Sequence, residues 1–192
     1  DQRILEQSYP TMQRWLTFLE TKQKDGILAP YVGVGYVDME WSFLGDWVAP
    51  NRGQGAGTRV DDNSTLFFNN CFYVHSLQIA AQTATVLGKA EDAATYTMQA
   101  EALAARVHER FLNADGATYV NREQPYLAMP LLFGVTPKDK RGAVMDALRD
   151  AILVKQQGHL NTGMHGTYFM LRYLTDKDHN DLVYTIASKR TY

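Results

Sequence analysis

The segment from Thr65 to Leu87 constrains the fold of this chain more than any other part of the sequence. Apolar residues recur along it at the three- and four-residue spacing of an α-helix, on one side of the helix: Tyr73, Leu77, Ala80, Ala84 and Leu87. A second apolar stripe is formed by Phe72, Ile79 and Val86. A helix that is apolar on two sides is expected to pack inside a bundle of helices.

The residues after this helix predict a tight turn into a second helix. Gly88 suits the left-handed conformation that ends many helices, and Glu91 and Asp92 are acids suited to the first turn of the next one. The buried face of that next helix is predicted from Tyr96, Ala100, Leu103, Val107 and Phe111. Because the connection is so short, the two helices are expected to form an antiparallel hairpin.

Helical periodicity also dominates the rest of the chain. The first segment carries one apolar stripe (Leu5, Tyr9, Met12, Leu16 and Leu19), which Pro10 interrupts, so a kink or a late helix start is expected there. The segment QPYLAMPLLFG predicts a short helix, the residues up to Gly158 a longer one, and YFMLRYLTD and NDLVYTIASKR two more. With a brief strand at ATYV, we expect an all-α chain of about seven helices in antiparallel hairpins.

Composition excludes several classes of protein. The net charge is −2 and the charged residues are interspersed, so the basic stripe of a nucleic-acid-binding protein is absent from the sequence. The longest apolar runs are too short for a membrane span, and no membrane partner is expected. One cysteine, Cys71, cannot form an intrachain disulfide or a thiolate zinc cluster, and the five histidines lack metal-ligand spacing. No metal or cofactor is therefore expected.

One long loop, residues 26–64, interrupts the helical pattern and contains the stretch WSFLGDWVAP at residues 41–50. Trp41 and Trp47 flank an acid, Asp46, and Gly45 lets the backbone turn between them. An aromatic plate can cover the C–H face of a sugar ring while a carboxylate accepts hydrogen bonds from its hydroxyls. This combination predicts a saccharide-binding site. The alternative is a lid in which Trp41, Phe43 and Trp47 cover the core.

The order of the helices is typical of barrels built from helical hairpins, in which a sugar site lies at one end among the connecting loops. The expected rim loops here are 26–64, 113–124 and 158–166. The alternative outside enzymes is a helical-repeat interaction module. Such a module should show a continuous concave groove and no aromatic-acid pocket, but the sequence has no repeat of fixed period.

Two parts of the chain carry a family resemblance. The run from LGDWVAP through LFFNNCFYVHSLQIAAQTATVLGKAEDAATYTMQAEALAARVHERF to YLAMPLLFGVTP, and then GHLNTGMHGTYFMLRYLTDKDHNDLVYTIASKRTY, resembles the catalytic domain of bacterial α-L-rhamnosidases, glycoside hydrolase family 78. The GDW element and the NTG…GTYF segment are the most specific parts. The resemblance implies part of an (α/α)6 toroid of six hairpins and the inverting hydrolysis of terminal α-L-rhamnosyl bonds in oligosaccharides or glycosides.

The resemblance also implies where the catalytic residues lie. The family's general acid is a glutamate in an Asp-Cys-Pro-type motif, and its general base is a glutamate in a Trp-Glu motif; neither motif occurs in residues 1–192. We therefore expect a single domain, 1–192, that is a fragment of a larger barrel and is inactive alone. Glu40 and Asp46, the acids beside the aromatics, are the alternatives for acid/base work within the chain.

Substrate contact is the role that the resemblance assigns to this chain. Asp46 and Trp47 match the family's GDW element, with Trp47 as the wall of the sugar pocket and Asp46 as hydroxyl acceptor or loop anchor. Trp41 is a weaker match beside them. His159 and His165 flank the NTG turn at the expected rim; we expect each to be satisfied by backbone groups or, for His165, to contact substrate.

Two further expectations follow. Another six-hairpin carbohydrate enzyme, of the glucuronyl hydrolase, trehalase or sugar epimerase type, would need its catalytic carboxylates or histidines inside this chain, directed at one cavity. A partial barrel should expose apolar faces on helices 65–87 and 124–133, and self-association through these faces is expected. The sequence leaves open whether this bacterial protein is periplasmic, secreted or cytoplasmic.

Overall fold

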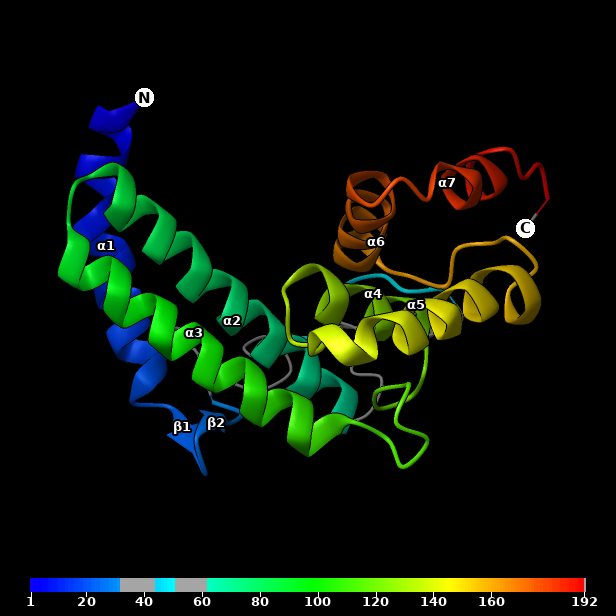
Figure 1. Ribbon diagram of the computed structural model, residues 1–192, viewed down its shortest axis with the longest axis horizontal. Coiled ribbons are helices and arrows are strands. Elements are labelled where there is room, and N and C mark those ends of the chain that lie inside the picture. Colours follow the sequence, from blue (N-terminus) through cyan, green and yellow to red (C-terminus); the bar gives the residue numbers. More distant parts are fainter. Residues whose placement is uncertain (32–43, 51–61, 192) are drawn as a thin grey trace.

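The computed structural model describes residues 1–31, 44–50 and 62–191, and this part of the chain is mostly helical. The seven α-helices among the described residues confirm the expected all-α class: α1 (Gln2–Glu20), α2 (Asp62–Val86), α3 (Ala90–Phe111), α4 (Gln124–Leu132), α5 (Arg141–Asp150), α6 (Met164–Asp176) and α7 (Asn180–Ala187). A 3-10 turn, η2 (Lys138–Lys140), precedes α5, and a π-helical turn, η3 (Ala151–Lys155), extends it. Figure 1 shows α1, α2 and α3 side by side at one end of the molecule and α4 to α7 at the other.

Helix α1 begins before Pro10, so the predicted late start is wrong. The Asp1 side chain accepts the backbone N–H of Arg3 at 3.0 Å, and the helix then runs through Pro10 to Glu20. Proline removes one hydrogen bond from a helix. Packing offsets this cost, because Leu16 and Leu19 are buried and the buried Tyr9 donates its hydroxyl hydrogen to Asp92 of α3 at 2.7 Å.

The α2–α3 hairpin forms as predicted. Gly88 has a φ of +70°, its N–H donates to the Thr85 carbonyl at 3.1 Å, and the Lys89 N–H donates to the Ala84 carbonyl at 2.8 Å. These two bonds form the Schellman motif, which closes a helix on a left-handed glycine. The helices then run antiparallel along their length (Figure 1).

The second apolar stripe of α2 is covered only in part. Phe72 packs edge-on against Phe169 of α6, with ring centroids 5.3 Å apart. Farther along the helix, Ile79 and Val86 are 41% and 57% exposed. Figure 1 shows why: the C-terminal half of α2 runs away from α4 and α6. The expected exposed apolar face on helix 65–87 is therefore present.

Helix α4, in contrast, is enclosed, so the expected exposed face on helix 124–133 is wrong. Every residue from Gln124 to Leu131 is buried, and α2, α5 and α6 all contact the helix. The sequence QPYLAMPLL is apolar on every side, which is the pattern of a helix surrounded by protein. This central helix ties the two ends of the molecule together.

The described strands are two short segments, β1 (Gln23–Lys24) and β2 (Ile27–Leu28), which pair antiparallel. Asp25 and Gly26 form the turn between them with φ values of +54° and +76°, the conformation that Asp-Gly favours in two-residue hairpins. The strand predicted at ATYV is reduced to one bridge between Leu112 and Tyr119. None of the described helices combines the length and apolar character needed to cross a membrane.

Candidate functional site

The side chain of Asp46 fastens the segment 44–50 to the start of α6. One carboxylate oxygen accepts the backbone N–H of Gly163 at 2.6 Å, and the other accepts that of Gly166 at 2.8 Å. The carbonyl of Trp47 accepts the N–H of Met164 at 2.8 Å. The first turn of a helix has N–H groups without partners inside the helix. Residues 46 and 47 supply those partners from a distant part of the chain.

The two glycines make this contact possible. A Cβ atom at Gly163 would lie 2.1 Å from the Trp47 carbonyl oxygen and 2.7 Å from a carboxylate oxygen of Asp46. At Gly166 it would lie 2.2 Å from the other oxygen of Asp46 and 2.7 Å from Pro125 of α4. Only glycine lets the helix approach so closely. No role for Gly163 or Gly166 was predicted from the sequence, although two glycines spaced three residues apart at a predicted helix start were a usable signal.

The other side of the segment 44–50 is also held. The Asn69 side chain of α2 donates to the Leu44 carbonyl at 2.8 Å. Val48, directly after the fastened pair, has a φ of +60°, a conformation that β-branched residues rarely adopt and that costs about 1–3 kcal/mol. The hydrogen bonds of Asp46 and Trp47 can hold this strained backbone in place. Strain of this kind often marks a functional region.

A buried glutamine fixes the neighbouring loop that precedes α6. Gln124, 1% exposed at the start of α4, accepts the N–H of Asn161 at 2.8 Å and donates to the His159 carbonyl at 2.9 Å. The hydroxyls of Thr162 and Thr167 bond at 2.6 Å. The loop 158–163 is thus a positioned surface rather than a free connection.

Two candidate substrate-contact residues lie on this scaffold. Trp47 is half-buried, and His165 is exposed between the two anchored glycines. The His165 ring packs edge-on against Phe72, with centroids 5.8 Å apart, and at a tilt against Phe68, at 6.4 Å. Asp46, Trp47 and His165 therefore lie together at the start of α6.

Burial dominates the electrostatics of Asp46. Desolvation raises the pKa of this carboxyl above its usual range, while the N–H bonds from Gly166 and Gly163 and the charge of nearby His165 act in the opposite direction. Both oxygens are occupied by backbone donors and the residue is 1% exposed. Of the two roles expected for Asp46, this geometry favours the loop anchor over the hydroxyl acceptor.

The remaining predicted residues divide into two groups. Glu40 and Trp41 lie outside the described residues. His159 is half-buried and its Nδ1 donates to the Gln156 carbonyl at 2.9 Å, which agrees with an imidazole satisfied by the backbone. In the ranges that the structure describes, no three His, Cys, Asp or Glu side chains gather into a group able to hold a metal ion.

The amino-acid sequence of the whole chain matches a known protein family. The sequence profile of the bacterial alpha-L-rhamnosidase 6 hairpin glycosidase domain matches residues 1–192. The chain belongs to this family. Over its full length the chain is 28% identical to the alpha-L-rhamnosidase of an Alteromonas species and 29% identical to that of Streptomyces avermitilis. The matched segments make up 20% and 16% of those two proteins.

Solved structures agree with the family's six-hairpin fold. The alpha-L-rhamnosidase from Dictyoglumus thermophilum superimposes with a TM-score of 0.84 at 24% identity, over 100% of this chain and 20% of that one. The Streptomyces avermitilis alpha-L-rhamnosidase complexed with L-rhamnose gives a TM-score of 0.80 at 27% identity, over 100% of this chain and 16% of that one. The chain spans at most a fifth of the length of these relatives.

Proposed function

We propose that this chain is a fragment of the larger helical barrel that forms the catalytic domain of an enzyme that removes terminal α-L-rhamnose from oligosaccharides or glycosides by inverting hydrolysis. Inversion requires a general acid and a general base whose carboxyls lie roughly 6.5–9.5 Å apart, with a water between them. In this proposal residues 1–192 position the sugar and the catalytic pair comes from other parts of the enzyme. The anchored Asp46 is the observation that carries the proposal.

Asp46 supports a positioning role because both of its carboxylate oxygens already bond to backbone N–H groups in a buried place. A general acid must hold a proton that it can transfer to the leaving group, and a general base must reach a water. Each oxygen of Asp46 already accepts a backbone N–H at 2.6 or 2.8 Å in a buried place. Its proposed function is to hold Trp47 and the start of α6 in a fixed relation.

Trp47 and His165 are the proposed contacts with the sugar. In this proposal the indole of the half-buried Trp47 stacks on the apolar face of the ring, and the exposed His165 imidazole bonds a hydroxyl. Trp41 is proposed as a second aromatic contact, and Glu40 as the weaker alternative for acid/base work. Rhamnose is the proposed ligand because the relative in Streptomyces avermitilis is described in complex with L-rhamnose.

The test is an assay of the full-length protein on an aryl α-L-rhamnoside beside the corresponding glucoside and glucuronide. We expect hydrolysis of the rhamnoside alone, and NMR should detect the product first with inverted anomeric configuration. Residues 1–192 alone should give no turnover; clear turnover would place the catalytic pair inside this chain. His165→Ala should raise KM more than it lowers kcat, and His159→Ala serves as the matched control because that ring bonds the Gln156 carbonyl.

Self-association of this 192-residue chain is a second, independent proposal. Ile79 and Val86 present exposed apolar side chains one above the other on the C-terminal half of α2, and a second copy could cover them. Sedimentation should show concentration-dependent dimers that the double variant Ile79→Lys, Val86→Lys disperses. Met98→Lys, which removes an exposed apolar side chain from α3 instead, is the control that should leave association unchanged. A monomer at all concentrations would refute the proposal.

A further inference from the structure

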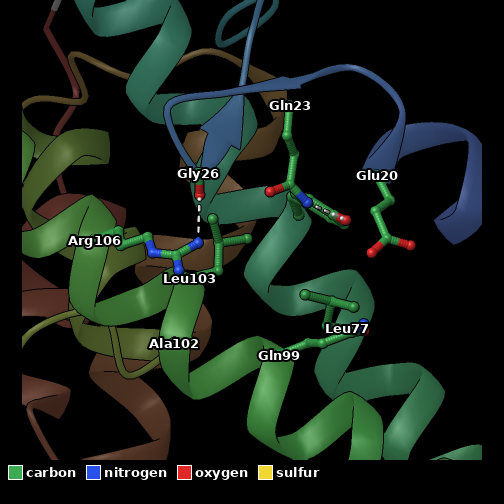
Figure 2. Close-up of a pocket in the computed structure, with 9 residues that line it drawn as sticks. Glu20, Gln23, Gly26, Leu77, Gln99, Ala102, Leu103 and Arg106 are labelled. Atoms are coloured by element: carbon green, nitrogen blue, oxygen red, sulfur yellow. Dashed lines mark hydrogen bonds between the residues drawn. The ribbon is translucent and has the colours of Figure 1, made fainter.

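A small pocket opens where the end of α1 and the β1–β2 hairpin meet α2 and α3. Its volume is about 220 Å³. The floor is made by the buried side chains of Tyr73, Leu77 and Leu103, and polar groups surround it: Glu20, Gln23, Gln99 and Arg106. Figure 2 shows Glu20 and Arg106 on opposite sides of the opening, with Gln23 between them on a third side. In Figure 1 the β1–β2 hairpin lies apart from segment 44–50, so this pocket is separate from the candidate site.

The Arg106 guanidinium forms one wall of the pocket. Its Nη1 donates to the carbonyl of Gly26 at 3.3 Å (Figure 2). A Cβ atom on Gly26 would lie 2.7 Å from that Nη1 and 3.0 Å from Cδ, so the guanidinium lies directly against the glycine backbone. A guanidinium has five N–H donors, and this contact uses one of them. The others remain available toward the pocket and solvent.

The polar side chains of the pocket keep hydrogen-bonding groups that the protein itself does not use. In the part of the chain that the structure describes, the Glu20 carboxylate and the Gln99 amide have no hydrogen-bond or ion-pair partner. The Gln23 amide donates to the Tyr73 hydroxyl at 3.1 Å. Burial raises the pKa of Tyr73, the bond from Gln23 opposes the rise, and the charge of Glu20 adds to it, so the hydroxyl stays protonated and keeps a hydrogen to donate.

We propose that this pocket binds a neutral polyhydroxylated molecule the size of a single sugar ring, at a site distinct from that of Asp46 and Trp47. The volume corresponds to about seven waters and lies below the roughly 300 Å³ at which pockets for larger organic ligands begin. A single ring with its hydroxyls matches this volume. The leucine floor suits its C–H groups, and the surrounding carboxylate, amides and guanidinium suit its hydroxyls.

The opposed charges of Glu20 and Arg106 select against ions. An anion would meet the Glu20 carboxylate, and a cation would meet the Arg106 guanidinium, so each would gain one favourable contact and one unfavourable contact. A hydroxyl can donate to the carboxylate and accept from the guanidinium. A neutral polyol can therefore use both sides of the pocket at once.

The test is a titration of the 192-residue protein with L-rhamnose and D-glucose, followed by backbone amide NMR shifts of Gly26 and Leu103. D-glucuronate, D-glucosamine and glycine serve as the anionic, cationic and zwitterionic probes. We expect at least one neutral sugar to saturate these shifts with a Kd on the order of 1–10 mM, and D-glucuronate and D-glucosamine to bind at least about tenfold more weakly. Glycine, whose two charges could pair with Glu20 and Arg106, tests whether the pocket instead prefers a zwitterion. The result does not depend on the proposed rhamnosidase function, since it needs no catalysis.

Two matched pairs of variants locate the site. Ala102→Trp places an indole in the pocket mouth and should abolish the saturable shifts, whereas Ala105→Trp, at an exposed alanine of α3 outside the pocket, should leave them unchanged. Gln99→Leu should weaken binding about fivefold or more, and Gln82→Leu on exposed α2 surface should not. No saturable shift with either neutral sugar, preference for a charged probe, or equal effects of the two tryptophans would overturn the proposal.

Discussion

The carboxylate of Asp46 lies 2.6 Å from the backbone nitrogen of Gly163, although 117 residues separate the two along the chain. This contact joins segment 44–50 of the long loop to the first turn of α6. It fixes Trp47 and His165 on a shared scaffold because the same turn receives a second bond from Asp46 and one from the Trp47 carbonyl. The stability of the fold and the shape of the candidate site therefore depend on the same three hydrogen bonds.

Asp46→Asn tests the anchor directly. The asparagine oxygen can still accept one backbone N–H, but its NH2 group then faces the other backbone N–H. That buried N–H loses its hydrogen bond. We expect a loss of about 1–3 kcal/mol in the free energy of unfolding, measured by chemical denaturation. Asp146→Asn is the control, because Asp146 is exposed on α5 and should change stability by less than about 0.5 kcal/mol. Equal effects of the two variants would refute the anchor.

Gly163→Ala tests the close approach of α6. The added methyl group would meet the Trp47 carbonyl at 2.1 Å, so the segment 44–50 must move, and we expect destabilisation by about 1–3 kcal/mol. Gly142→Ala in α5 is the matched control. A Cβ there meets no atom within 4 Å, and alanine favours a helix over glycine, so this variant should gain about 0.5–1 kcal/mol. Thermal unfolding of both variants would show shifts of opposite sign.

Parts of the fold that depend on local interactions could be predicted from the sequence, and parts that depend on contacts between distant residues could not. The α2–α3 hairpin could be predicted because its stripes and its terminating Gly88 are local signals, and Gly88 has the left-handed conformation that was expected. The sequence left open whether α1 continues through Pro10 or starts near it, because the contact that offsets the lost bond joins Tyr9 to Asp92 of α3, 83 residues away in sequence. The enclosure of α4 was available from its all-round apolar sequence, but expecting a partial barrel led to the opposite prediction.

The candidate site follows the same division. The residue types around Asp46 and Trp47 indicated saccharide binding, and the sequence placed His165 near the same rim. The partners that hold Asp46 could not be predicted, because they are backbone N–H groups of Gly163 and Gly166 and carry no side-chain signature. Tertiary hydrogen bonds to backbone groups are set by the path of the chain rather than by residue type.

Leu77→Asp tests the placement of the buried face of α2. Leu77 is 2% exposed, and a carboxylate there would be buried without a partner, so we expect a loss of more than about 4 kcal/mol and unfolding of the hairpin in circular dichroism. Ile79→Asp, two residues along the same helix at 41% exposure, is the control and should keep the helical signal. Unchanged circular dichroism in Leu77→Asp would show that the face is misplaced.

His75 belongs to the aromatic cluster between α2 and α6, and its protonation makes the free energy of unfolding depend on pH. Its ring stacks on Phe133 with centroids 4.3 Å apart and an interplanar angle of 11°, and Phe169 packs edge-on against it at 6.0 Å. Burial lowers the pKa of this imidazole below 6.5, the charge of Arg172 lowers it further, and a bond with Gln78 opposes the shift. The folded protein therefore favours the neutral ring.

The sign of the resulting pH dependence follows from this shift. Between pH 6.5 and the lower pKa of the folded state, the unfolded chain binds more protons at His75 than the folded chain does, so the free energy of unfolding falls as the pH decreases through this window. His75→Phe keeps an aromatic ring against Phe133 and removes the titration, so the loss of stability between about pH 7.5 and about pH 5.5 should become smaller. Burial also lowers the pKa of His108, so this residue contributes in the same direction. Adding His108→Gln to His75→Phe should therefore flatten the profile further. Denaturation midpoints across this range measure both steps, and an unchanged slope in His75→Phe would show that this imidazole does not change its protonation on unfolding.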